Sequence, residues 1–330
     1  MSASSTAAGS PGRSISALVS VALLRRLLPA ASFVILLGAI ISINPRAGTY
    51  MGLTLILNLA VPLVLATLSQ MLVIAVNDND LSIGAFVGFI ACAGSLWLQS
   101  SPWMTIGIFV LSIAVYALLG WLIQAYRLPS LAMTLGMSFV WYGFAVVMLP
   151  APGGQAPAWL HHAMTWRPAF IPLPLLISLV LAVVMHMLVM HSSFGVLARG
   201  LGGNGRALAR ASWSLLAIRA GTYAAAGLLG VLSGVSLLGL ATSGDANMAG
   251  RYTLLSIAGV ILGGGEFVGG KVSAVGAVFG ALTLSLVTVL LTFLSISTDW
   301  QIGSQGVILI LVLALRALLQ RNSDAEGPVA

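Results

Sequence analysis

Two carboxyl groups stand between long apolar runs, in the sequence Asn77-Asp78-Asn79-Asp80, and Ser82 follows closely. A charge at membrane depth is costly, so such residues usually face a cavity or mark a solute pathway. Asparagine and aspartate also favour turns over helix, so a helix break is expected here. Asp80 either caps the following helix, accepting N–H bonds at its positive end, or lines a pathway. The two roles can coexist.

A second break is rich in glycine and carries two opposite charges, Glu266 and Lys271, within reach of each other. Glycine is a poor helix former, so a regular helix is not expected to continue through it. We predict a bend or re-entrant turn near the cytoplasmic face, with a plain connecting loop as the alternative. The candidate gating residues are Gly263, Gly264, Gly265, Glu266, Gly269, Gly270 and Lys271.

Polar residues recur in the apolar run before the first break, with Pro62 beside them. On a continuous helix Thr54, Asn58 and Ser69 would lie within about 40° of one another. Such a stripe suits a substrate lining, and it suits hydrogen bonding between helices equally well. Together with the first break, the candidate pathway residues are Thr54, Asn58, Ser69, Asn77, Asp78, Asn79, Asp80 and Ser82.

The segment 192–213 is basic, contains no acid, and is the longest polar stretch between apolar runs. It has a dinucleotide-like glycine pattern at 200–205, but no acidic residue follows it at the required distance. The segment 265–271 nearly fits a phosphate-binding loop, but Val272 stands where Ser or Thr would bind magnesium. No cofactor or metal is therefore expected on this chain, and no catalytic residue is predicted.

Charged residues are scarce, at 6% of the chain against 59% hydrophobic residues, and the mean hydropathy is +1.07. Three charge-free stretches, 81–126, 220–244 and 272–298, each exceed the roughly 20 residues of a membrane-spanning helix. A soluble protein of this length could not hide so much apolar surface from water. The long continuous runs favour helices, so we predict an all-α, polytopic membrane protein.

We expect about ten membrane helices, some of them broken or re-entrant. The N-terminus is predicted to be cytoplasmic, because eleven of the fourteen Lys and Arg residues then fall on the cytoplasmic side. The C-terminus is predicted to lie on the same side. We divide the chain into a disordered cytoplasmic tail at 1–28, a membrane domain at 29–320 and a cytoplasmic tail at 321–330. The predicted helices are 27–43, 50–76, 82–99, 103–124, 129–149, 171–191, 214–241, 252–264, 272–296 and 301–320.

Four motifs follow one another along the chain. They are Asp80-Leu81-Ser82-Ile83-Gly84; Leu128-Pro129 with Thr134-Leu135-Gly136 and Gly143; Phe194-Gly195 with Gly202-Gly203-Asn204 and Ala207; and a glycine-rich block at 260–282. In this order they resemble the permease subunits of bacterial ABC importers for ribose, xylose, arabinose and related sugars. The resemblance covers residues 53–319.

This resemblance implies a transport subunit in a bacterial inner membrane, energised by separate ATPase subunits that hold ATP and magnesium. It also implies an external sugar-binding protein and a second permease, either a copy or a paralogue; no nucleic-acid partner is expected. The sugar and the choice between homodimer and heterodimer stay open. The ATPase is expected to bind the cytoplasmic coupling loop 192–213, at Arg199, Gly202, Gly203, Asn204, Arg206 and Arg210.

A rival hypothesis needs no ATPase. Carboxylates at breaks in membrane helices are also what ion-coupled secondary transporters use. In that case Asp78, Asp80 or Glu266 would form the ion site, and uptake would proceed in vesicles without an ATPase.

Overall fold

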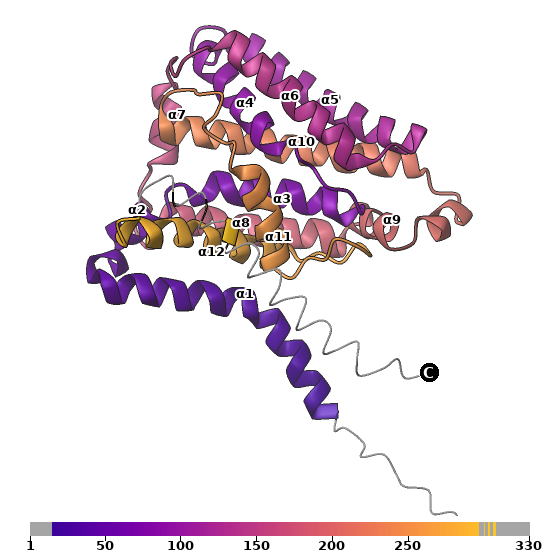
Figure 1. Ribbon diagram of the computed structural model, residues 1–330, viewed down its shortest axis with the longest axis horizontal. Helices are drawn as coiled ribbons and strands as arrows, with labels where there is room; N and C mark the ends of the chain where they lie inside the picture. Colours follow the sequence, from indigo (N-terminus) through magenta and orange to yellow (C-terminus); the bar gives the residue numbers. More distant parts are fainter. Residues whose placement is uncertain (1–14, 297–299, 301–302, 304–305, 308–330) are drawn as a thin grey trace, which may run out of the picture.

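The computed structural model describes residues 15–296, 300, 303 and 306–307, and the regular structure of these residues is entirely helical (Figure 1). The all-α prediction is therefore confirmed. The helices are α1 (Ile15–Ile43), α2 (Tyr50–Ile56), α3 (Ala60–Ala75), α4 (Ile83–Trp97), α5 (Pro102–Tyr126), α6 (Ser130–Met148), α7 (Ala158–Met164), α8 (Leu173–His186, continued by a π-helix at Met187–His191), α9 (Ser193–Arg210), α10 (Leu215–Ala241), α11 (Tyr252–Leu262) and α12 (Ala274–Phe293).

Five helices of this part of the chain, α5, α6, α8 with its π-helix, α10 and α12, are long and apolar enough to cross a membrane. The count becomes six if the bent pair α2 and α3 is one broken span and not a re-entrant loop. The count of ten stays a prediction, because α4 and α11 are short and most of 301–320 lies outside the described residues. The same holds for 1–14 and for the tail 321–330, whereas α1 begins at Ile15, inside the segment expected to be a disordered tail.

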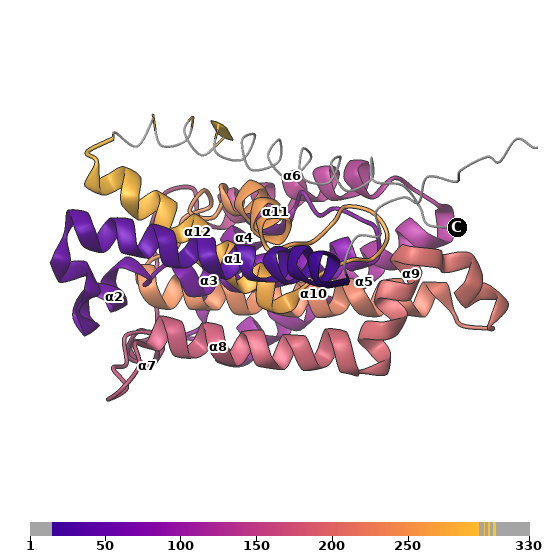
Figure 2. The same cartoon turned by 90° about the horizontal axis from the view of Figure 1, so that it is seen from below.

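The longer helices run side by side, with α9 at one end of the bundle and α2 and α7 at the other (Figures 1 and 2). We call these the α9 end and the α7 end. Helix α3 is central, since all its residues are buried and it packs against α10, α11 and α12. Helix α11 lies across its neighbours instead of along them (Figure 1). The outer helices α5 and α6 expose large apolar side chains, as lipid-facing helices do.

The predicted helix 50–76 is broken, and its two parts, α2 and α3, meet at an angle of 49°. Pro62 accounts for the break, because its ring excludes the carbonyl of the residue four positions earlier, Asn58. Proline is tolerated in the first turn of α3, where N–H groups need no partner within the helix. Thr54, Asn58 and Ser69 consequently do not form one continuous stripe.

Two segments between the predicted membrane helices contain helices of their own. Residues 150–171 include the short helix α7, and the basic segment 192–213 forms α9. Ser192 caps α9 by accepting a hydrogen bond from the Gly195 N–H at 3.1 Å. Helix α9 is kinked at Asn204, whose backbone is not helical.

Helices α3 and α10 are antiparallel and joined by a reciprocal pair of hydrogen bonds. Ser69 Oγ donates to the Ala226 carbonyl at 2.8 Å, and Ser233 Oγ donates to the Pro62 carbonyl at 2.7 Å. The two donors, Ser69 and Ser233, are 164 residues apart along the chain, and the two acceptors, Pro62 and Ala226, are also 164 residues apart. This spacing indicates two halves that repeat in opposite directions across the bundle.

The repeat continues beyond these helices. Asn77 after α3 and Thr242 after α10 both adopt left-handed backbone. A carboxylate then accepts a hydrogen bond from the N–H two residues further on, Asp80 from Ser82 and Asp245 from Asn247. Both halves next form a short helix, α4 in the first and α11 in the second. Inverted repeats with interrupted helices are a common construction of membrane transporters.

Candidate functional site

Two non-helical segments enter the interior of the bundle. We call residues 76–82, between α3 and α4, the first connector, and residues 242–251, between α10 and α11, the second connector. Helix α4 begins at mid-length of the bundle, since Phe86 packs on Gly230 of α10. At 1.5 Å per residue, Gly230 lies about 22 Å along α10, a helix of roughly 40 Å. The first connector therefore leads from the α9 end to the middle.

Backbone groups at such depth need partners inside the protein. Gln70 of α3 supplies two, in the amide orientation that satisfies both: Nε2 donates to the Asp80 carbonyl at 3.0 Å, and Oε1 accepts from the Asp80 N–H at 3.1 Å. Thr134 Oγ1 of α6 accepts from the Leu81 N–H at 3.1 Å and donates to the Asn79 carbonyl at 3.2 Å. Side chains thus replace the neighbouring strand that an extended segment normally pairs with.

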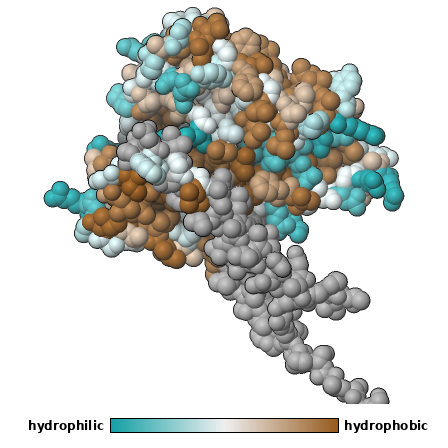
Figure 3. Space-filling model, in the orientation of Figure 1, coloured by the Kyte–Doolittle hydropathy of each residue, from teal (hydrophilic) through white to brown (hydrophobic). Residues whose placement is uncertain are grey.

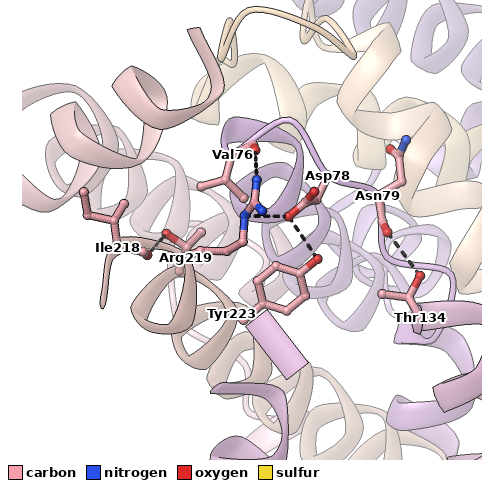
Figure 4. A network of polar contacts seen from close by, with 8 residues as sticks. Val76, Asp78, Asn79, Thr134, Ile218, Arg219 and Tyr223 are labelled. Carbon is pink, nitrogen blue, oxygen red and sulfur yellow. Dashed lines mark hydrogen bonds and ion pairs between the residues drawn. The ribbon is translucent and has the colours of Figure 1, made fainter. Parts of the chain in front are cut away.

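Asp78 is buried and paired with a cation (Figure 4). Its Oδ2 atom lies 3.2 Å from Arg219 Nε and accepts a hydrogen bond from the Tyr223 hydroxyl at 3.3 Å. Arg219 also donates to the Val76 carbonyl at 3.5 Å. The pair fixes the first connector to α10, because a charge at this depth is stable only with its partner in place.

Asp80 is fully buried and accepts three hydrogen bonds. Its Oδ1 accepts from the Ser82 N–H at 2.7 Å and the Ser82 hydroxyl at 2.6 Å, and its Oδ2 accepts from the Tyr116 hydroxyl at 2.9 Å. The N-cap of α4 is Ser82, so Asp80 lies two residues before the cap and fixes the backbone that leads into the helix. This arrangement is close to the capping role expected from the sequence.

The basic helix α9 and the glycine-rich turn, which the sequence treats as separate features, are in contact. A Cβ on Gly202 of α9 would overlap the Ala75 carbonyl and would stand 3.1 Å from Gly270 Cα. A Cβ on Gly270 would overlap the Arg199 carbonyl, and Gly270 has left-handed backbone, with φ of 66°. Gly203 lies against the Gly269 carbonyl. Helix α9 is therefore seated on both the end of α3 and the glycine turn.

Of the other predicted residues on α9, two make contacts within the protein and two are exposed. Arg199 Nε donates to the Val189 carbonyl at 3.1 Å, which ties α9 to the π-helix. Asn204 Oδ1 accepts from the Ala207 N–H at 3.1 Å and restarts the helix after the kink. Arg206 and Arg210 are exposed on the outer part of α9, where they can contact a partner.

In the glycine turn, Lys271 Nζ lies 3.1 Å from Glu266 Oε2. The Lys271 side chain is 70% exposed, so this pair adds at most about 1 kcal/mol to stability. Gly264 has φ of 94° and Gly269 has φ of 89°. The turn is therefore a non-helical connection built on left-handed glycines.

The predicted pathway residues take two kinds of position. Ser69, Asp78, Asp80 and Ser82 are buried and bonded to protein groups. The others are half-buried or exposed: Thr54 Oγ1 donates to the Tyr50 carbonyl at 2.8 Å, Asn58 stands at the α2–α3 break, Asn77 is exposed, and Asn79 is half-buried.

Of the residues that hold the first connector, the sequence does not single out Gln70, Tyr116, Arg219 or Tyr223, and it marks Thr134 only as part of a motif. Gln70 is an amide in an otherwise apolar helix, and such a residue in a membrane span signals a partner. The tyrosines give no comparable signal, since aromatic residues occur throughout the membrane helices.

Replacing Gln70 with leucine is expected to lower the melting temperature of the detergent-purified protein, because both backbone groups of Asp80 lose their partner. We estimate a cost of about 2–4 kcal/mol, since a buried group left unpaired costs about 1–3 kcal/mol. Ser138→Ala is the control: Ser138 Oγ donates to the Leu135 carbonyl at an exposed site. Equal melting temperatures for the two variants would contradict this role of Gln70.

Within the described ranges, no three His, Cys, Asp or Glu side chains gather where they could bind a metal ion. Cys92 is buried and has no disulfide partner.

The chain matches a known protein family over residues 52–313, described as the permease component of the branched-chain amino acid transport system. Among curated proteins it is 27% identical to the probable ABC transporter permease protein YphD of Escherichia coli, over 79% of this chain and 80% of the relative. It is 28% identical to the galactofuranose transporter permease of the same organism, over 69% of each chain. No solved structure gives a significant match.

The ribose import permease of Escherichia coli is 25% identical, over 86% of this chain and 90% of the relative. Matches of this extent cover both connectors, α9 and the glycine turn. The candidate site therefore lies inside the region that matches the family.

Proposed function

Because this chain belongs to the family of permease components of branched-chain amino acid transport systems, and is a sugar-importer permease within it, we propose that it moves a monosaccharide into the cytoplasm. Separate ATPase subunits energise the step from the cytoplasm. An external binding protein delivers the sugar, and a second permease, a copy or a paralogue, completes the path. The chain resides in a bacterial inner membrane, with the α9 end cytoplasmic.

The contacts of α9 with the end of α3 and with the glycine turn support this proposal. Helix α9 touches the end of α3, where the first connector begins, and it touches the glycine turn between α11 and α12. A partner that displaced α9 would therefore act on both interrupted helices at once. Packed interfaces of this kind transmit small displacements because they have discrete arrangements and do not deform continuously.

The rival hypothesis of ion coupling lacks a free carboxylate among the predicted ones. Asp78 is paired with Arg219, Asp80 accepts three hydrogen bonds, and Glu266 is paired with Lys271. In the first connector, Asp78 and Asp80 instead hold the backbone of the segment in one conformation. They position the wall of the pathway without contacting the solute.

The direct test uses the complex of this chain with its ATPase, reconstituted in vesicles with the binding protein. We expect ATP-dependent uptake of at least one sugar from a panel of D-ribose, D-xylose, L-arabinose and D-galactose. Uptake driven by an ion gradient in vesicles without the ATPase would overturn the proposal.

Reversing charge on α9, by Arg206→Glu or Arg210→Glu, is expected to reduce uptake while the protein level in the membrane stays unchanged. Both side chains are exposed at the α9 end, so neither change disturbs packing. Loss of a charged contact in an interface typically costs about 2–5 kcal/mol when it is buried there. Arg167→Glu is the matched control, an exposed arginine near the α7 end. Normal uptake by both α9 variants would count against the docking role.

A further inference from the structure

The pathway needs polar groups at mid-depth, and the carboxyl groups of the first connector do not serve, since Asp78 and Asp80 are buried and engaged inside the protein. The second connector differs in this respect. Asn247, Gly250 and Arg251 are exposed, and Asp245 is half-buried. Figure 3 shows hydrophilic patches between hydrophobic ones on the face of the molecule that is turned to the viewer in Figure 1.

These residues lie at the middle of the bundle. The Gly84 N–H, at the start of α4, donates to Thr253 Oγ1 of α11 at 3.1 Å. A Cβ on Gly84 would stand 2.7 Å from the Ala249 carbonyl oxygen, and one on Gly88 would stand 2.7 Å from that of Ala246. The second connector therefore descends from the α7 end along α4 and reaches mid-depth at Arg251.

Lipid is not a suitable neighbour for this surface, for two independent reasons. An arginine at mid-depth in a membrane protein faces the bundle interior or a water-filled cavity. Non-helical backbone at that depth is tolerated only where protein covers it or water lines it. Helices at the same level show the contrast, because their exposed residues are apolar, as at Leu118 of α5 and Leu228 of α10.

We propose that the exposed face of the second connector is the wall of the sugar path and that Asp245, Asn247 and Arg251 contact the sugar. This inference rests on the proposed function. The chemistry fits a polyhydroxylated solute: the arginine and amide groups donate hydrogen bonds to hydroxyl oxygens, and the carboxylate accepts from hydroxyl groups. The opposite wall is the same face of a second permease.

The experiment uses thiol labelling of the whole transporter in vesicles. Cys92 is the chain's own cysteine and is replaced by alanine, and single cysteines are then placed at Asn247, Arg251 and Leu118. A charged, membrane-impermeant thiol reagent is expected to modify Asn247→Cys and Arg251→Cys, with loss of labelling when a transported sugar is present in excess. Leu118→Cys is expected to react only with a lipid-soluble maleimide, which also shows that the variant is inserted.

The outcomes separate this inference from the proposed function. If uptake persists but neither connector cysteine reacts with the charged reagent, lipid or another segment of the chain covers the face, and the inference is wrong. If the cysteines react and uptake persists without protection by the sugar, the contact with the sugar is wrong. If the parent transporter takes up no sugar while the cysteines still react, the proposed function fails and the water-lined wall stands.

Discussion

The variant Asp80→Leu is expected to lose uptake and to unfold at a clearly lower temperature than the parent protein. Leucine has nearly the same size, but it leaves the Ser82 N–H, the Ser82 hydroxyl and the Tyr116 hydroxyl without their acceptor. Asp80, Ser82 and Tyr116 are all fully buried, so water cannot replace the lost acceptor. We estimate a loss of about 3–5 kcal/mol, the range found when one partner of a buried charged network is removed. Thermal unfolding in detergent and sugar uptake in vesicles measure the two effects.

Asp80→Asn is the matched variant, because its side-chain oxygen can still accept from Ser82 and its amide can donate to the Tyr116 oxygen. We expect it to retain most of the stability and most of the uptake. An Asn variant that folds normally but transports nothing would instead show that the charge itself is needed. That result would favour ion coupling over the positional role argued for Asp80.

The fold was predictable to the extent that it depends on local composition. Scarce charge identifies the membrane helices, and Pro129 and Pro102 stand at the starts of α6 and α5, where proline is tolerated. Pro62 also marks the break between α2 and α3, but the polar residues around it favour one continuous helical face, so the sequence predicts an unbroken helix over 50–76.

The inverted repeat could not be predicted from the sequence. Ser69 corresponds to Ser233 and Asp80 to Asp245, but Asn77 corresponds to Thr242 and Ser82 to Asn247, so residue types alone do not reveal the two halves. Backbone geometry carries the similarity, in the left-handed residues Asn77 and Thr242 and the turns that follow. Such geometry is set by tertiary packing, which a single sequence does not reveal.

The candidate site was predicted in parts but not as an assembly. The sequence marks Asp78 and Asp80 as unusual but gives no means of pairing Asp78 with Arg219, which is 141 residues away along the chain. It likewise separates Gly202 from Gly270. Helix crossings decide these contacts, and the crossings depend on which helices pack together.

The contact of Gly202 with Ala75 leads to the second large effect, expected for Gly202→Ala. In an exposed helix, alanine in place of glycine stabilises by up to about 1 kcal/mol. Here the added Cβ would overlap the Ala75 carbonyl, so α9 must move by about 1 Å to restore an ordinary contact distance. We expect uptake to fall at least tenfold, while ATP hydrolysis by the complex continues but no longer responds to the sugar-loaded binding protein.

Gly200→Ala separates this steric effect from any general effect of alanine on α9. A Cβ at Gly200 would stand 3.4 Å from Leu208 Cδ1, the flexible end of a side chain, and can be accommodated. Uptake by Gly200→Ala should therefore match the parent. If both variants transported normally, α9 would not need its seat on α3, and coupling would have to reach the connectors by another route. If both failed equally, the kink at Asn204 and the flexibility of α9, not the seat, would be the feature that ATPase binding requires.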